Sequence, residues 1–279
     1  MKPLSSQALD RIGKNWDLAK ETREAKLQAT NRFAEFVEQK FGLQRIENLK
    51  PGHVQAYAEH LHQEGISPRT GSNYMSAVRD VCKALGKGGI VAKSNAAYGF
   101  GGVSRQNPIN VDHEKIGSIR SELETMAANG HRTAMMMATS AEMRDAFGLR
   151  HKESLMSHEV RLVNGKACLV VEGAKGGRER LLEIRTESQI NALDRVAMTA
   201  QLLDSGSGRI IPPEMTLKQA LNAESKLWNK LGGTREARAN MHAQRHAYAQ
   251  DRSQESATKA ELNQELGHGE QRSLGHYTD

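Results

Sequence analysis

The sequence predicts a mainly α-helical protein of two domains, with a small antiparallel β-sheet in the second domain. Three observations support this prediction. Apolar residues recur at helical spacing over most of the chain, the period changes to two only between residues 160 and 184, and a glycine-rich stretch with neither period separates two helical regions. A chain of 279 residues can bury a core in each of two domains.

The first predicted domain, residues 1–93, is a small helical bundle. One amphipathic helix is expected from Trp16 to Phe41, a second from Pro51 to Gly65, and a third from Ser67 to Leu85. Proline opens the second and third helices and a glycine follows each of the three, as is typical of helix ends.

Residues 94–111 (SNAAYGFGGVSRQNPINV) are predicted to be an inter-domain linker, because they contain three glycines and a proline and lack a helical period. Their GFGG segment is not a nucleotide-binding loop, since no strand precedes it and the G-x-G-x-x-G spacing is incomplete.

The second predicted domain, residues 112–279, begins with a helix capped by Asp112 and continues with a helix from Arg132 to Phe147, whose methionine cluster we interpret as core. Three short antiparallel strands are expected at VRLV, ACLVVE and RERLLEI. The other helices are expected at Lys152–Ser157, Thr186–Leu203, Leu217–Leu231, His242–Arg252 and Ala257–Leu266.

Charge and composition favour an intracellular protein with a polyanionic partner. The net charge is +6, and the segment from Ile66 to Arg105 carries six basic residues against one acidic residue. We expect phosphate contacts from four of them, although a solvated basic surface is the alternative; the four are Arg69, Arg79, Lys83 and Lys87. Two isolated cysteines, no membrane-length apolar run and no apolar stretch near the start predict a cytoplasmic location.

Five features carry chemistry-bearing residues, and each has an ordinary structural alternative. Arg150 and Glu153 stand three apart in FGLRHKESL, as a surface ion pair would. Lys175 lies in a predicted hairpin turn, where most lysines are simply solvated. The remaining features, taken singly, are equally ordinary: His242, Arg245 and His246 in MHAQRHAYAQ, His268 after Leu-Gly, and Tyr277 near the last residue.

Together these features resemble the tyrosine recombinases, the phage-integrase superfamily, in order and spacing. FGLRHKESL resembles the first arginine box of the family, AKGGRERLLEI its lysine hairpin, HAQRHAYA its H-x-L-R-H box, and LGHGEQRSLGHYTD its segment ending in the nucleophilic tyrosine. The first domain resembles the SAM-like core-binding domain of the family. The sequence departs from the pattern at Gln244, where leucine is usual. Many relatives also continue past the tyrosine with a segment that docks on a neighbouring subunit, which a chain ending at Asp279 either lacks or has lost.

The resemblance implies a role for each matching residue. Arg150 and Arg245 would neutralise the extra charge of a pentacoordinate phosphorane, because guanidinium groups remain charged and offer a planar fork to phosphate oxygens. Tyr277 would form a 3′-phosphotyrosine, and Lys175 would protonate the leaving 5′-oxygen. His242 and His268 would also be catalytic, donating to phosphate oxygens or accepting the proton of the tyrosine. Glu153, which would orient a site residue, and His246, a structural partner, would have supporting roles. No cofactor, neither ATP nor a divalent cation, is expected.

The implied function is site-specific recombination that integrates or excises a mobile element. The expected partners are double-stranded DNA, a homotetramer on two DNA sites, and accessory factors that bend DNA or set direction, in a bacterial nucleoid. Two alternatives remain, a type IB topoisomerase and a DNA-binding protein without catalysis. A metalloenzyme fits less well, because Ala243 stands where a zinc protease would carry its general-base glutamate.

Overall fold

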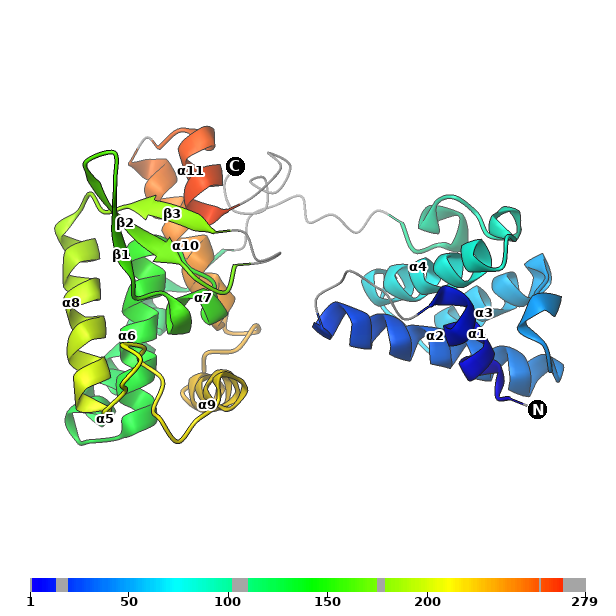
Figure 1. Cartoon of the computed structure of the whole chain (residues 1–279), viewed down its shortest axis with the longest axis horizontal. Coiled ribbons are helices and arrows are strands. Elements are labelled where there is room, and N and C mark those ends of the chain that lie inside the picture. Colours follow the sequence, from blue (N-terminus) through cyan, green and yellow to red (C-terminus); the bar gives the residue numbers. More distant parts are fainter. Residues whose placement is uncertain (1, 14–19, 102–109, 175–178, 256, 268–279) are drawn as a thin grey trace. The chain divides into compact units, whose positions relative to one another are not determined.

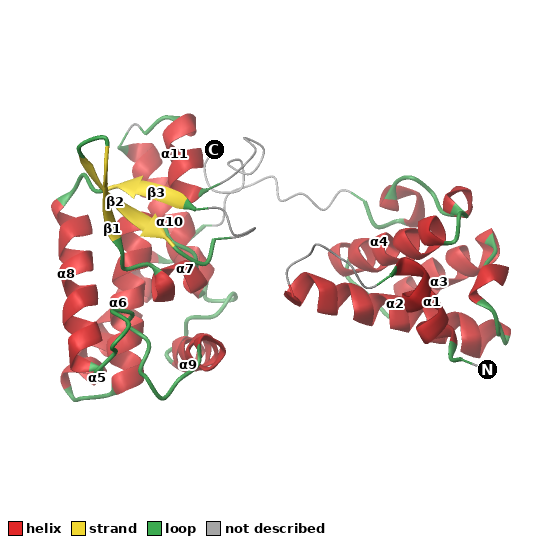
Figure 2. Ribbon diagram, in the orientation of Figure 1, coloured by secondary structure: helices red, strands yellow, loops and turns green. Residues whose placement is uncertain are grey.

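The computed structural model describes residues 2–13, 20–101, 110–174, 179–255 and 257–267. The chain divides into two compact units, residues 1–104 and 105–279, called here the N-terminal and the C-terminal unit. Helices dominate both units, and a three-stranded sheet belongs to the second (Figures 1 and 2). None of the helices in these ranges is both long and apolar enough to cross a bilayer.

The N-terminal unit is a bundle of α1 (Leu4–Ile12), α2 (Lys20–Phe41), α3 (Pro51–Gln63) and α4 (Pro68–Ala84), with short 3₁₀ turns between α2 and α3 and after α4. The three helices predicted here are confirmed within the described residues, while the predicted start at Trp16 lies outside them. Helix α1 was not predicted, because nine residues with only Leu4 and Ala8 fully buried give a weak periodic signal.

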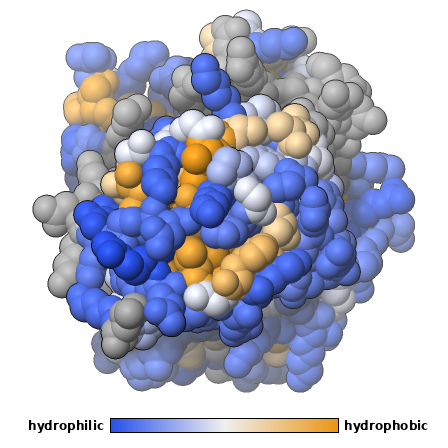
Figure 3. Space-filling model, turned by 90° about the vertical axis from the view of Figure 1, so that its right-hand side faces the viewer, coloured by the Kyte–Doolittle hydropathy of each residue, from blue (hydrophilic) through white to orange (hydrophobic). Residues whose placement is uncertain are grey.

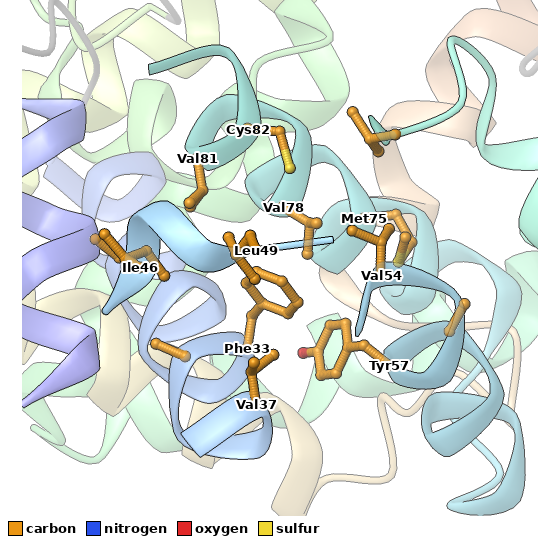
Figure 4. Packing of buried hydrophobic residues seen from close by; sticks show 14 of the residues in the cluster. Phe33, Val37, Ile46, Leu49, Val54, Tyr57, Met75, Val78, Val81 and Cys82 are labelled. Atoms are coloured by element: carbon orange, nitrogen blue, oxygen red, sulfur yellow. The ribbon is translucent and has the colours of Figure 1, made fainter. Parts of the chain in front are cut away.

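The core of the bundle is apolar and interlocked. Rings of Phe33 and Tyr57 meet edge to face with their centroids 5.1 Å apart, and aliphatic residues of α4 and of the 3₁₀ turn after α2 close around them (Figure 4). One face of this unit, shown in Figure 3, is largely hydrophilic around a narrow apolar band.

The N-terminal unit extends beyond the predicted boundary at residue 93. Asn95–Tyr98 form a 3₁₀ turn and Phe100 is 1% exposed, stacked on His62 with ring centroids 4.2 Å apart. A Cβ on Gly71 of α4 would approach the Phe100 ring to 2.3 Å, so glycine at this position makes room for the ring. The described start of the glycine-rich segment is therefore packed structure rather than a free linker.

Helix α6 (Arg132–Phe147) is the centre of the C-terminal unit. Its side chains enter two separate core clusters, with Met136 and Met143 in one and Met137 in the other, and all three methionines are fully buried. The methionine cluster is therefore core, as predicted. Around α6 lie α5 (His113–Ala128), α7 (His151–Met156), α8 (Glu187–Leu202), α9 (Leu217–Lys230) and α10 (Met241–Gln254).

The sheet follows α7 and has the order β1 (Val160–Val163), β2 (Lys166–Val171) and β3 (Arg180–Glu183). Both pairings are antiparallel, with Val163 opposite Lys166 across the Asn164-Gly165 turn and Val171 opposite Arg180. The three predicted strands are thus confirmed. The last described helix, α11 (Lys259–Leu266), packs on α10 and ends at Gly267 in the left-handed conformation.

Candidate active site

Arg150 lies immediately before α7, where the buried carboxylate of Glu153 fixes its position. The backbone N–H of Arg150 donates to Oε2 of Glu153 at 2.8 Å, and its guanidinium Nη1 donates to Oε1 at 2.7 Å. A carboxylate is favoured at a helix N-terminus because free N–H groups point toward it. The Arg150 side chain is 30% exposed, so part of its guanidinium can still reach a ligand.

Arg245 of α10 binds the same backbone oxygen as Arg150. Its guanidinium is buried and donates to the carbonyl oxygens of Gly148 and Leu266. Nη2 of Arg150 donates to the same Leu266 oxygen at 3.4 Å. Leu266 is the last residue of α11, where carbonyl groups lack partners within the helix and carry partial negative charge. The two predicted arginines therefore converge on one oxygen atom.

A third guanidinium, that of Arg180 on β3, completes the charge pattern around Glu153. Its Nη2 donates to Oε2 of Glu153 at 3.0 Å, and the two side chains are 10% and 1% exposed. Burial raises the pKa of the Glu153 carboxyl, but the charges of Arg180 and Arg150 outweigh burial and hold that pKa below its usual value. Glu153 is therefore an ionised carboxylate that orients two arginines.

Arg180 was not singled out in the sequence, although one signal was available. In a strand, residues two apart share a face, so Arg180 lies on the same face of β3 as the buried Leu182. An arginine at an inward-facing position implies a buried partner. The carbonyl groups of Gly148 and Leu266 could not be found in the same way, because backbone groups leave no trace in the sequence pattern.

Close backbone approaches hold α10 and α11 in place around the arginines. Gly148 has a φ of +62°, and a Cβ on it would come within 2.5 Å of the Tyr248 ring. The Tyr248 hydroxyl donates to Glu265 of α11 at 2.9 Å, and burial together with this carboxylate raises the pKa of Tyr248. The Tyr248 hydroxyl therefore stays protonated and acts as a hydrogen-bond donor, which makes it poorly suited to act as a nucleophile.

The two histidines of the H-x-L-R-H box, His242 and His246, differ in exposure. His242 is exposed in the first turn of α10, and His246 is 2% exposed one turn later. Their rings meet edge to face with centroids 5.0 Å apart. Since residues three apart share a helix face, His242 projects on the same side of α10 as Arg245. The other predicted site residues, Lys175, His268 and Tyr277, lie outside the described residues.

The four basic residues predicted to contact phosphate divide into two pairs. Arg69 and Lys83 are exposed on α4. Arg79 donates instead to the carbonyl oxygen of Ala92 at 3.1 Å, and Lys87 donates to two carbonyl groups in the segment between α2 and α3. Arg79 and Lys87 therefore hold the N-terminal unit together, which leaves Arg69 and Lys83 available for phosphate.

Across the ranges that the structure describes, histidine, cysteine, aspartate and glutamate side chains form no group of three or more that could hold a metal ion. The charge concentrated around Leu266 is that of guanidinium groups.

A helical unit followed by a helical unit with a three-stranded sheet, whose paired arginines meet at the end of one helix, defines an integrase-type DNA recombinase fold. The family model described as "Integrase" matches residues 108–251, more than half of the chain, and "Phage integrase, N-terminal" matches residues 1–91. The chain belongs to the integrase family of tyrosine recombinases.

Individual relatives agree with this assignment. Tyrosine recombinase XerD of Caulobacter vibrioides is 28% identical over 152 residues, which are 54% of this chain and 47% of the relative. The chain thus spans about half the length of this curated relative.

Solved structures share the fold at low sequence identity. XerH site-specific recombinase bound to palindromic difH has a TM-score of 0.65 at 16% identity, over 90% of this chain and 74% of that one. The Tn1549 transposon integrase with circular intermediate DNA has a TM-score of 0.62 at 14% identity, over 100% and 96%. A lambda integrase tetramer bound to a Holliday junction has a TM-score of 0.65 at 14% identity, over 97% and 76%.

Proposed function

We propose that this protein is a site-specific recombinase that cleaves and rejoins DNA through a 3′-phosphotyrosine, integrating or excising a mobile element. The observation that carries the proposal is the convergence of Arg150 and Arg245 on the single Leu266 oxygen. Two guanidiniums that can donate to one carbonyl oxygen can also donate to a non-bridging phosphate oxygen. Membership of the integrase family supports this assignment.

The proposed reaction needs positive charge more than any other contribution. When the Tyr277 hydroxyl attacks phosphorus, it loses its proton, a P–O bond forms, and the bond to the 5′-oxygen breaks. The intermediate phosphorane carries extra negative charge on its non-bridging oxygens, and Arg150 and Arg245 neutralise that charge. Loss of one such preorganised donor costs about 10²- to 10³-fold in rate.

Proton transfer is assigned through the family resemblance. Lys175 gives a proton to the leaving 5′-oxygen, and the attacking tyrosine loses its proton to His268 or His242. Rejoining reverses these steps when the 5′-hydroxyl of a second strand attacks the phosphotyrosine. The bond energy is conserved in the covalent intermediate, so the cycle consumes no ATP.

The proposed partners follow from the relatives. XerH, the Tn1549 integrase and lambda integrase were all solved with DNA, and lambda integrase as a tetramer on a Holliday junction. We infer that this protein also acts on double-stranded DNA as a homotetramer, at the bacterial nucleoid in the cytoplasm, with accessory factors that set direction. Arg69 and Lys83 supply contacts that position the DNA without specifying its sequence.

A covalent-adduct assay tests the proposal. The DNA would span the junctions of the element that carries the gene, with a nick beside the cleavage position so that the released fragment diffuses away. Wild-type protein should form an adduct in the presence of EDTA, and Tyr277→Phe should form none. An adduct that persists in Tyr277→Phe would refute the assigned nucleophile. Relaxation of supercoils without recombinant product would favour the topoisomerase alternative, and DNA binding with no adduct would favour the non-catalytic one.

A further inference from the structure

Arg144 of α6 is a wholly buried guanidinium at the centre of a polar network in the C-terminal unit. Its Nε donates to Oε1 of Gln244 at 2.7 Å, and its Nη1 donates to Oγ of Ser140 at 3.0 Å and to Oγ of Ser154 at 3.3 Å. Burial lowers the pKa of Arg144, although nearby carboxylates oppose this shift. A guanidinium in such a place needs both a counter-charge and oriented acceptors.

Glu224 of α9 provides the counter-charge. Its carboxylate is 0% exposed and lies 3.7 Å from Nη1 of Arg144. The Ser140 hydroxyl donates to Oε1 at 2.6 Å, and Nε2 of His151 lies 2.6 Å from Oε2. The indole ring of Trp228 covers the guanidinium at 5.8 Å. Four helices, α6, α7, α9 and α10, therefore meet in one hydrogen-bonded cluster.

Gln244 explains the departure from the family pattern. Its side-chain oxygen accepts from Arg144, and its Nε2 donates to Oδ1 of Asp145 at 3.1 Å. A leucine at position 244 could make neither bond. It would leave the buried guanidinium of Arg144 without its Nε acceptor, and the partly exposed Asp145 without one of its donors. Gln244 thus supplies a hydrogen-bond acceptor to the buried Arg144, which leucine could not do.

The network holds α7 and α10 at positions adjacent to Arg150, Glu153 and Arg245. Glu224 binds His151, which follows Arg150, and Arg144 binds Ser154, which follows Glu153. Arg144 also binds Gln244, which precedes Arg245. Successive residues on a helix point about 100° apart, so neighbouring side chains lie on different faces. Hydrogen bonds on the buried faces of α7 and α10 therefore limit the rotation and sliding of both helices, and so fix where Arg150 and Arg245 lie.

We propose that Arg144 is a positioning residue, which through Gln244, Ser154 and Glu224 sets the relative placement of Arg150 and Arg245. This inference rests on the proposed function for its rate measurement. A misplacement of about 1 Å at a site of this kind costs roughly 10²-fold in rate, so small shifts of α7 or α10 matter. A network that served stability alone would gain little from buried charge, because apolar residues of similar volume are often as stabilising.

Two variants test the proposal from different sides of the network. Gln244→Leu removes the acceptor for Arg144 on α10, and Ser154→Ala removes one hydroxyl on α7 and is small enough to keep the fold. Both variants should slow single-turnover cleavage of pre-bound nicked DNA, Gln244→Leu by about 10- to 100-fold and Ser154→Ala by several-fold. The dissociation constant for DNA should stay within about twofold of wild type, because both side chains are buried and cannot contact DNA themselves.

The matched control is Thr199→Val, which breaks the buried Thr139–Thr199 hydrogen bond of 2.7 Å between α6 and α8. This variant should lose thermal stability yet cleave at the wild-type rate when all proteins are compared at the same interval below Tm. Equal slowing in Thr199→Val and Gln244→Leu, or wild-type rates in both network variants, would overturn the proposal.

A spectroscopic measurement separates this inference from the proposed function. In the full-length protein without DNA, the ¹⁵N–¹H resonances of the guanidinium Nε groups of Arg150 and Arg245 should shift or broaden in Gln244→Leu and stay in place in Thr199→Val. If wild-type protein forms no adduct, the proposed function fails while these resonances still test positioning. Unchanged resonances in Gln244→Leu would overturn the positioning role even in an active recombinase.

Discussion

The ion pair between Arg180 and Glu153 should stabilise the C-terminal unit, and Arg180→Met measures by how much. Removing one partner of a buried pair typically costs about 3–5 kcal/mol. Glu153 keeps the guanidinium and the backbone N–H of Arg150, at 2.7 and 2.8 Å, so its charge is not left alone. We therefore expect a loss of about 2 kcal/mol, the contribution of one hydrogen bond to a charged group.

Urea denaturation followed by Trp228 fluorescence reports this loss, because Trp228 is fully buried in the C-terminal unit. Trp16, the other of the two tryptophans in the sequence, would be replaced by phenylalanine in every protein compared. With an m value of about 2 kcal/mol/M, the midpoint should fall by about 1 M. The control is Lys166→Met, which removes an ion pair whose side chains are 61% and 25% exposed and should change stability by less than about 0.5 kcal/mol.

Non-additivity provides the second check. Arg180→Met and Glu153→Gln act on the same pair, so the double variant should lose clearly less stability than the two single losses added together. A midpoint shift in Arg180→Met no larger than in Lys166→Met, or strict additivity in the double variant, would refute the assigned pair.

Three further outcomes are expected. The folded pKa of Glu153 lies below the ordinary value of 4.5, so the ionised carboxylate contributes its full stabilisation above pH 4.5 and loses it as pH falls through the folded pKa. The Tm of Glu153→Gln should therefore depend less on pH below 4.5 than the Tm of wild type. Gly42→Ala, where the added Cβ meets open space, should cost roughly 1–2 kcal/mol of left-handed strain. Gly267→Ala should cost more, measured by Tm, because its Cβ would lie 2.3 Å from Nη1 of Arg180. Tyr248→Phe should still form the covalent DNA adduct on denaturing gels, and loss of the adduct would contradict the account of Tyr248 as a structural donor.

The sequence predicted the elements well where the periodic signal was strong. Helix α6, the sheet with its Asn164-Gly165 turn and the Asp112 cap of α5 are confirmed, and each rests on local chemistry. Helix α1 and the packed segment around Phe100 were missed, because their order depends on contacts with residues far along the chain.

The candidate site was predicted in part. The boxes identified Arg150, Glu153 and Arg245, and the structure brings them together. The tertiary partners, Arg180 and the buried Arg144, escaped notice because an arginine is ordinarily a surface residue and only the fold reveals its burial.

The central claim is that fixed guanidinium charge stabilises a negatively charged phosphorane, and a methylphosphonate substrate tests it directly. Replacing one non-bridging oxygen by a methyl group removes the charge that the arginines neutralise. On ordinary DNA, Arg245→Ala should cleave about 10²- to 10³-fold more slowly than wild type. On methylphosphonate DNA this deficit should shrink to less than about tenfold. An equal deficit on both substrates would contradict the claim.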